Sequence, residues 1–310
     1  MAVAPRPHFR WALHTRSLVL GERTLLVGVV NVTPDSFSDG GKFLSATSAI
    51  DHALTLLDEG ADILDIGGES TRPGMRPPVF AQEELNRVLP VMGGILKTRP
   101  ETILSIETYK AETARAAVRA GAQIVNDVSG FLWDPAMAAA CAKLRCGVIL
   151  MHTRGRSHEW RTQPPLPPAE VVPLVLRELK QCADAAIAAG IDHTAIVLDP
   201  GFGFGKVLEE NYPLLARFDE LHTLGYPLLA GVSRKAFLGR TLAQMYGHEV
   251  PTDQRGNATV AAVTAAVLAG AHLVRIHDVK AAREAVAIAD AIRSGSMAAP
   301  LLPASPSAAG

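Results

Sequence analysis

The chain has 310 residues, a formal net charge of −1 and a hydrophobic fraction of 48%. This composition supplies enough apolar side chains for a buried core, and it excludes a chain that is disordered throughout. The near-zero charge argues against general binding of nucleic acid, and no apolar run reaches the ~18 residues that a bilayer span needs.

The amino terminus carries basic residues but neither the apolar stretch nor the cleavage pattern of a secretory signal. The three cysteines, Cys141, Cys146 and Cys182, have no Cys-x-x-Cys spacing, so the sequence predicts neither a disulfide framework nor a zinc site. Reduced, buried thiols are typical of intracellular proteins. We therefore expect a soluble cytoplasmic protein.

Residues 1–24 hold two short runs around Leu18–Leu20 and Gly21, which predict a hairpin-like extension at the bottom of the domain. Residues 25–293 then alternate short apolar runs with longer helical stretches, the pattern of a parallel sheet. Residues 294–310 are small, proline-rich and uncharged, and predict a disordered tail. The predicted strands are 25–31, 62–67, 102–107, 123–127, 147–151, 195–199, 227–232 and 272–276.

Most of these strands are continuously apolar, as expected when both faces of a sheet are covered. Several of the intervening helices end in a glycine, at Gly60, Gly121, Gly190 and Gly270. Eight β/α units fit a single-domain TIM (β/α)8 barrel better than a doubly wound sheet, which is the alternative. The predicted helices are 45–59, 81–97, 110–120, 134–143, 168–190, 208–218, 253–270 and 279–293.

Polar residues follow every predicted strand, and in a TIM barrel these positions share one rim. Asp199 and Asn126 suit a planar, guanidine-like edge, and Lys235 suits a ring carbonyl. Mg²⁺ takes few protein ligands and prefers hard oxygens such as that of Asn31. A heterocycle with an anionic leaving group is the predicted substrate. The cations that could hold an anion such as a diphosphate are Arg72, Lys235, Arg275 and protonated His277.

Each feature alone also has a structural explanation. A single strand-end Asp or Asn is often a helix cap, and the loop 31–41 could be a flexible connection. The GFGFGK run at 201–206 lacks the spacing of a phosphate-binding loop. His152 and His158 have no third ligand for zinc, and we interpret His193 as structural. The combination of residues, rather than any one of them, indicates a functional site.

Five blocks resemble the signature sequences of bacterial dihydropteroate synthases, in the order of that family and over nearly the whole chain. The blocks are NVTPDSFSDGG (31–41), DIGGESTRPG (65–74), LDPGFGFGK (198–206), GVSRK (231–235) and VRIHDV (274–279). The resemblance implies a Mg²⁺-dependent transferase of folate biosynthesis. It would join 6-hydroxymethyl-7,8-dihydropterin diphosphate to p-aminobenzoate and release pyrophosphate.

The resemblance also implies roles for individual residues. The catalytic residues would be Asp199, Lys235, Arg275 and His277. Asn31 would bind Mg²⁺, and loops 33–41 and 70–76 would cover p-aminobenzoate, where sulfonamides would compete. The family further suggests a homodimer. The substrate-binding residues would be Glu107, Asn126, Asp199 and Lys235 at the pterin, Thr71, Arg72, Arg275 and His277 at the diphosphate, together with Phe204 and Ser233.

Two positions depart from the family pattern. Glu107 stands where the family usually has Asp, and a carboxylate displaced by about 1 Å can cost ~10²-fold in rate. Ala236 stands where a Ser is common, which leaves the backbone N–H at a helix start for the p-aminobenzoate carboxylate. The alternatives are a non-catalytic pterin-binding paralogue and a pterin-dependent methyltransferase. We expect an SN1-like reaction, because the arylamine is a poor nucleophile.

Overall fold

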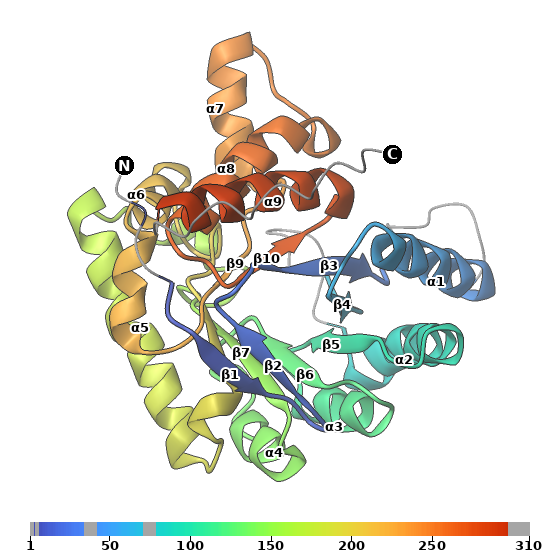
Figure 1. Cartoon of the computed structure of the whole chain (residues 1–310). Helices are drawn as coiled ribbons and strands as arrows, with labels where there is room; N and C mark the ends of the chain where they lie inside the picture. The colour runs from blue at the N-terminus through green and yellow to red at the C-terminus, as the bar shows by residue number, and fades with distance from the viewer. Residues whose placement is uncertain (1–2, 4–5, 34–41, 71–78, 297–310) are drawn as a thin grey trace, which may run out of the picture.

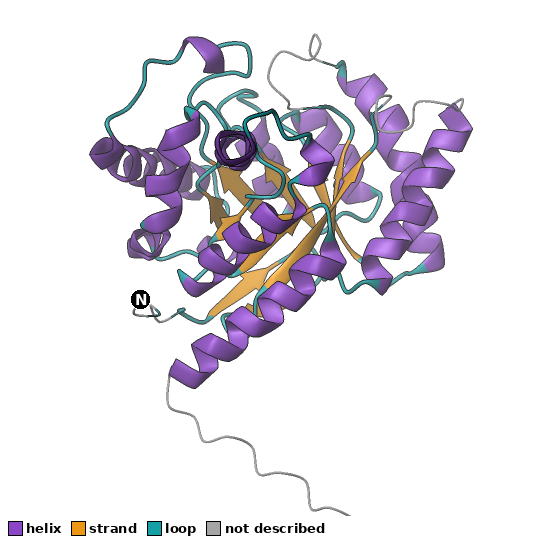
Figure 2. Ribbon diagram, turned by 90° about the horizontal axis from the view of Figure 1, so that it is seen from above, coloured by secondary structure: helices purple, strands orange, loops and turns teal. Residues whose placement is uncertain are grey.

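Eight parallel strands form a barrel with helices outside it in a computed structural model that describes residues 3, 6–33, 42–70 and 79–296 (Figures 1 and 2). The strand order is β8-β7-β6-β5-β4-β3-β10-β9, and a parallel bridge between Leu198 and Leu228 joins the two ends. The predicted TIM barrel is confirmed, and the doubly wound alternative is wrong. The strands are β3 (Leu25–Asn31), β4 (Ile63–Gly67), β5 (Ile103–Glu107), β6 (Ile124–Asp127), β7 (Gly147–Met151), β8 (Ile196–Asp199), β9 (Leu229–Ala230) and β10 (Leu273–Ile276).

The helices cover the outer faces of the strands, and the apolar side chains between these layers form the larger of two buried clusters. The α-helices are α1 (Lys42–Asp58), α2 (Ala81–Thr98), α3 (Ala111–Arg119), α4 (Met137–Leu144), α5 (Pro168–Ala188), α6 (Asn211–Ala216), α7 (Ala236–Tyr246), α8 (Gly256–Leu268) and α9 (Val279–Ser296). Short 3-10 helices are η2 (Trp160–Thr162), η3 (His193–Ala195), η4 (Leu208–Glu210), η5 (Phe218–Leu224) and η6 (Thr252–Gln254).

An antiparallel hairpin of β1 (Phe9–Ala12) and β2 (Ser17–Leu20) precedes the barrel. Its Trp11 is fully buried, and the indole Nε1 donates to the carbonyl oxygen of Ala195 at 2.9 Å. Trp11 packs with residues at the amino-terminal ends of the barrel strands, such as Leu25 and Ile124. The hairpin thus fills one end of the barrel, and the carboxyl ends of the strands lie at the other.

Four elements differ from the sequence prediction. Helix α7 was not among the predicted helices, and β9 is shorter than 227–232 because Pro227 and Gly231 bracket it. The predicted helix 208–218 is broken at Asn211, whose side-chain amide donates to the carbonyl oxygens of Val207 and Leu208. Helix α9 continues to Ser296 rather than ending at 293, and residues 297–310 lie outside the described residues.

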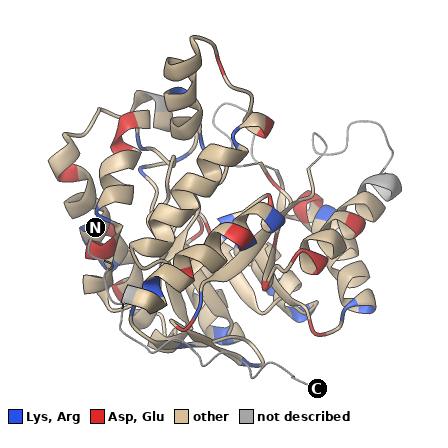
Figure 3. Cartoon of the chain, turned by 45° about the horizontal axis from the view of Figure 1, so that its top comes forward, with Lys and Arg blue, Asp and Glu red and all other residues tan. Residues whose placement is uncertain are grey.

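Acidic and basic residues are interspersed over the helices in the described part of the chain (Figure 3). None of its helices has both the length and the apolar character required to cross a membrane.

Candidate active site

A buried ionic cluster lies at the carboxyl ends of the barrel strands. Arg275 on β10 donates from Nε to Asp65 Oδ2 at 2.6 Å, and its second guanidinium branch pairs with Glu107 on β5. Asn126 Nδ2 on β6 donates to the same Asp65 oxygen at 2.9 Å. The Arg275 guanidinium therefore pairs with carboxylates from two other strands, and one of these carboxylates also accepts a hydrogen bond from an amide on a third strand.

The barrel geometry explains why these side chains meet. Successive side chains of a strand point to opposite faces, so every second residue enters the barrel. The register pairs Glu107 with Asn126, and it pairs Asp199 with Met151.

Burial raises the pKa of Glu107, and the Arg275 guanidinium opposes this effect. The pKa of Arg275 lies above its ordinary value because Glu107 and Asp65 outweigh the effect of burial, so Arg275 stays charged.

Asp199 and Lys235 are two further charged residues of the same rim, and each influences the pKa of the other. Asp199 is buried, and the backbone N–H of Gly201 donates to its Oδ1 at 2.8 Å. Burial raises the pKa of Asp199, whereas this hydrogen bond and the nearby Lys235 lower it. Burial lowers the pKa of Lys235 to about 8 although Asp199 favours the ammonium. Lys235 is thus a cation that titrates close to physiological pH.

The backbone before α7 aims Lys235 into the rim. Arg234 has a positive φ of 57°, which is uncommon for a residue with a side chain, and its N–H donates to Thr259 Oγ1 at 2.9 Å. Lys235 is the residue that precedes the first turn of α7, which begins at Ala236. The Lys235 ammonium lies 4.1 Å from the centroid of the Phe204 ring, a cation–π contact.

Ser233 and His277 stand beside this pair. Ser233 Oγ lies 2.9 Å from His277 Nδ1, and it accepts the backbone N–H of His277 at 3.2 Å. The structure therefore brings together Glu107, Asn126 and Arg275 in one group, and Asp199, Lys235 and Phe204 in another. Thr71 and Arg72 lie outside the described residues.

Comparison with known proteins gives this rim its context. Residues 27–277 match the family described as pterin binding enzyme. A dihydropteroate synthase of Bacillus subtilis (strain 168) is 41% identical over 270 residues, which cover 86% of this chain and 89% of that protein. A structure of Xanthomonas albilineans dihydropteroate synthase with 4-aminobenzoic acid has a TM-score of 0.83 at 42% identity, covering 95% of this chain and 100% of that one. This chain belongs to the dihydropteroate synthase family.

A structure of Yersinia pestis dihydropteroate synthase with a sulfonamide drug complex matches equally well, with a TM-score of 0.83 at 40% identity over 92% of this chain and 100% of that one. The chain is accordingly an enzyme, a transferase of folate biosynthesis, as the sequence blocks indicated.

The sequence prediction missed one member of the site. Asp65 is completely buried, binds both Arg275 and Asn126, and leaves Oδ1 without a hydrogen-bond partner among the described residues. The signal was present, because a carboxylate interrupts the apolar run of β4 (Ile-Leu-Asp-Ile) and a buried charge needs a partner. Asp65 lies inside β4 rather than at its carboxyl end, where the site residues were expected.

Asn31 is half-buried at the end of β3, paired in register with Gly67. Within the described residues, no group of three or more His, Cys, Asp or Glu side chains could hold a metal. A single amide oxygen nevertheless fits Mg²⁺, which keeps waters and shares phosphate oxygens of a substrate. The donor set is thus compatible with a metal that binds together with a diphosphate.

Proposed function

We propose that this chain condenses 6-hydroxymethyl-7,8-dihydropterin diphosphate with p-aminobenzoate, and that the two charged groups of the rim bind the pterin ring and promote departure of the diphosphate. The observation that carries this proposal is the convergence of the buried Asp199 and Asn126 and the half-buried Lys235 on one rim beside the Arg275 cluster. The 4-aminobenzoic acid in the Xanthomonas enzyme supports the second substrate.

Asp199 accepts hydrogen bonds from the amino and N–H edge of the pterin, and Lys235 donates to the ring carbonyl and nitrogen on the other side. Hydrogen bonds that involve a charged group contribute about 1.5–3 kcal/mol each. Burial strengthens both interactions because water is excluded from the rim. The ring is thereby held with its diphosphate-bearing carbon toward the cations.

Departure of the diphosphate is the difficult step, since the arylamine attacks weakly. Arg275 and His277 stabilise the charge that develops on the leaving group, and the pterin ring spreads the positive charge of an SN1-like transition state. Asn31 would hold Mg²⁺, which neutralises negative charge on the diphosphate when bound. The amine of p-aminobenzoate is already unprotonated at neutral pH, so no general base is required.

A pyrophosphate-release assay with both substrates tests the reaction, in the presence and absence of Mg²⁺. We expect Mg²⁺-dependent turnover, whereas binding of the pterin diphosphate without turnover would favour a non-catalytic paralogue. Calorimetry on Asp199→Asn tests the pterin site, with the exposed Asp184→Asn on α5 as a control. A loss of about tenfold or more in affinity is expected for Asp199→Asn alone, and native affinity in that variant would refute the assignment.

We further propose a cytoplasmic homodimer. Ile288 and Ile292 are exposed one turn apart on α9, which supports an apolar contact surface on this helix. Sedimentation of the native chain and of Ile288→Glu tests it: a dimer that dissociates in the variant supports α9 as the interface, and a monomeric native chain refutes the dimer.

A further inference from the structure

The loop after β8 packs unusually closely against the segment that follows β7. Gly201 has φ +67°, and a Cβ there would lie 1.9 Å from the carbonyl oxygen of His152. Gly205 has φ +68°, and a Cβ would lie 2.7 Å from Arg154 Cβ. Gly201 and Gly205 of the GFGFGK run are therefore required by this close packing rather than by a phosphate group.

Lys206 ends this run and is buried, with 6% of its surface exposed. Its Nζ donates to the carbonyl oxygen of Gly201 at 2.8 Å, and it lies 3.4 Å from that of Phe204. A third contact joins Nζ to His152 Nδ1 at 2.8 Å. Three acceptors around one nitrogen match the three hydrogens of an ammonium group.

The direction of the third hydrogen bond follows from its neighbours. Glu178 on α5 lies 2.9 Å from His152 Nε2, and a carboxylate can only accept. His152 must therefore carry its proton on Nε2. Burial lowers the pKa of His152 to about 4, so the ring is neutral and its Nδ1 accepts from Lys206. The chain of donors runs from Lys206 through His152 to Glu178.

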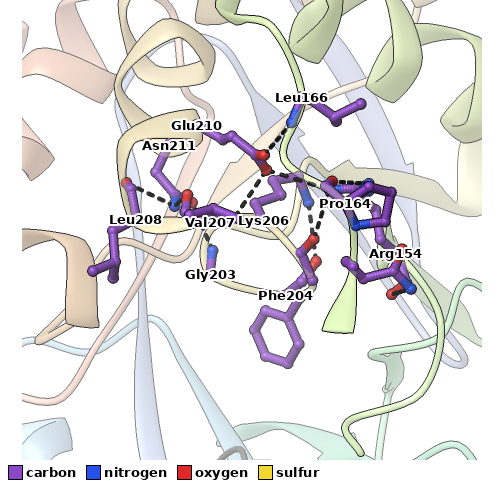
Figure 4. A network of polar contacts seen from close by, with 12 residues as sticks. Arg154, Pro164, Leu166, Gly203, Phe204, Lys206, Val207, Leu208, Glu210 and Asn211 are labelled. Atoms are coloured by element: carbon purple, nitrogen blue, oxygen red, sulfur yellow. Dashed lines mark hydrogen bonds and ion pairs between the residues drawn. The ribbon is translucent and has the colours of Figure 1, made fainter. Parts of the chain in front are cut away.

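The loop that Lys206 holds contacts two residues of the proposed pterin site, Asp199 and Lys235. At its start, the N–H of Gly201 fixes the Asp199 carboxylate, and further along the Phe204 ring lies beneath the Lys235 ammonium. The outer side of the loop is held separately, because Gly203 N–H donates to Asn211 Oδ1 at 2.7 Å and Val207 N–H donates to Glu210 Oε2 at 2.8 Å (Figure 4). On the inner side the Phe204 N–H donates to the Gly201 carbonyl oxygen at 3.1 Å, and Lys206 adds a side-chain donor that contacts the carbonyl oxygens of both Gly201 and Phe204.

We propose that Lys206 is a positioning residue for the pterin site: its ammonium, oriented by His152 and Glu178, clamps the Gly201–Phe204 turn and so sets both Asp199 and the aromatic support of Lys235. This inference rests on the proposed roles of Asp199 and Lys235. Lys206 does not need to touch either substrate.

The binding test compares Lys206→Met with Lys180→Met, which makes the same change at an exposed lysine of α5. Calorimetry with the pterin diphosphate should show an affinity about tenfold lower or worse for Lys206→Met, with a native value for Lys180→Met. Native pterin affinity in a folded Lys206→Met would overturn the inference.

The pH test uses Glu178→Gln, since the Glu178 side chain is 37% exposed and its replacement leaves the core intact. Burial lowers the pKa of Lys206 to about 7; Asp199 and Glu178 raise it, whereas Lys235 and Arg154 lower it further. Removing the Glu178 charge should therefore shift the alkaline loss of pterin affinity by about half a pH unit toward lower pH. Lys235 also titrates in this range, but Glu178 is not among the groups that perturb it.

If the alkaline loss of pterin affinity occurs at the same pH in Glu178→Gln as in the native chain, the proposed role of the Lys206 ammonium is wrong. This measurement tests the role of Lys206 even if Lys206→Met does not fold. Asp199→Asn distinguishes a failure of the proposed role of Lys206 from a failure of the proposed pterin site. Weak binding in Asp199→Asn with native binding in Lys206→Met refutes only the clamp, whereas native binding in Asp199→Asn refutes the proposed pterin site itself.

Discussion

Arg275 on β10 and Asp65 on β4 form an ion pair at 2.6 Å across β3, the strand that separates them in the barrel. The pair joins residues 210 positions apart in the chain. Arg275 is proposed to face the leaving diphosphate, so the carboxylate behind it sets the position of the cation on which catalysis depends.

Asp65→Asn removes this charge with almost no change of shape. The guanidinium would then be held by Glu107 alone and would shift toward it, so we expect kcat to fall about tenfold or more. Steady-state kinetics measures the effect. The control is Asp62→Asn. Asp62 lies immediately before the first residue of β4 and pairs with Arg23 away from the site, so this change should leave kcat unchanged. Equal kcat values in the two variants would show that Asp65 does not position Arg275 for catalysis.

Glu107 reaches Arg275 directly, which indicates how the longer acid is accommodated. We expect the native chain to turn over, Glu107→Asp to lose less than about tenfold, and Glu107→Gln to lose more because the charge itself is gone. The pyrophosphate-release assay ranks the three proteins. Turnover that appears only in Glu107→Asp would mean that the extra methylene has abolished the chemistry.

His272 should make the fold sensitive to acid. The ring is fully buried between the N–H of Leu228 and the carbonyl oxygen of Pro7, and burial lowers its pKa to about 3. The unfolded chain takes up this proton near pH 6.5, so the free energy of unfolding falls as pH drops from there toward 3. By pH 5 this histidine should cost about 2 kcal/mol.

Urea unfolding of the native chain and of His272→Asn at pH 7 and pH 5 measures this contribution. His152 shares the effect, so the variant should lose part of the pH dependence rather than all of it. Identical pH dependence in both proteins would show that His272 is not held neutral in the fold.

Gly201 should tolerate no side chain. In Gly201→Ala the new Cβ would meet the carbonyl oxygen of His152, whereas in Gly225→Ala, at φ +77°, nothing lies within 4 Å. Both variants pay the cost of a positive φ, about 1 kcal/mol, and only the first adds a backbone clash. Thermal unfolding should separate them clearly, and similar unfolding midpoints would contradict the close packing of the loop after β8.

The sequence by itself determined the barrel, because continuous apolar strands alternating with helices have few ways to bury both faces of a sheet. It also located most of the candidate site, since the carboxyl ends of parallel strands share one rim and Asp199, Asn126 and Lys235 all stand there. Only the tertiary structure decided which charges meet. Asp65 lies inside a strand and Glu178 on an outer helix, and nothing local in the sequence connects them with Arg275 or Lys206. Their partners are fixed by barrel closure and helix packing, which bring distant residues within hydrogen-bond range and exclude the water that would otherwise solvate them.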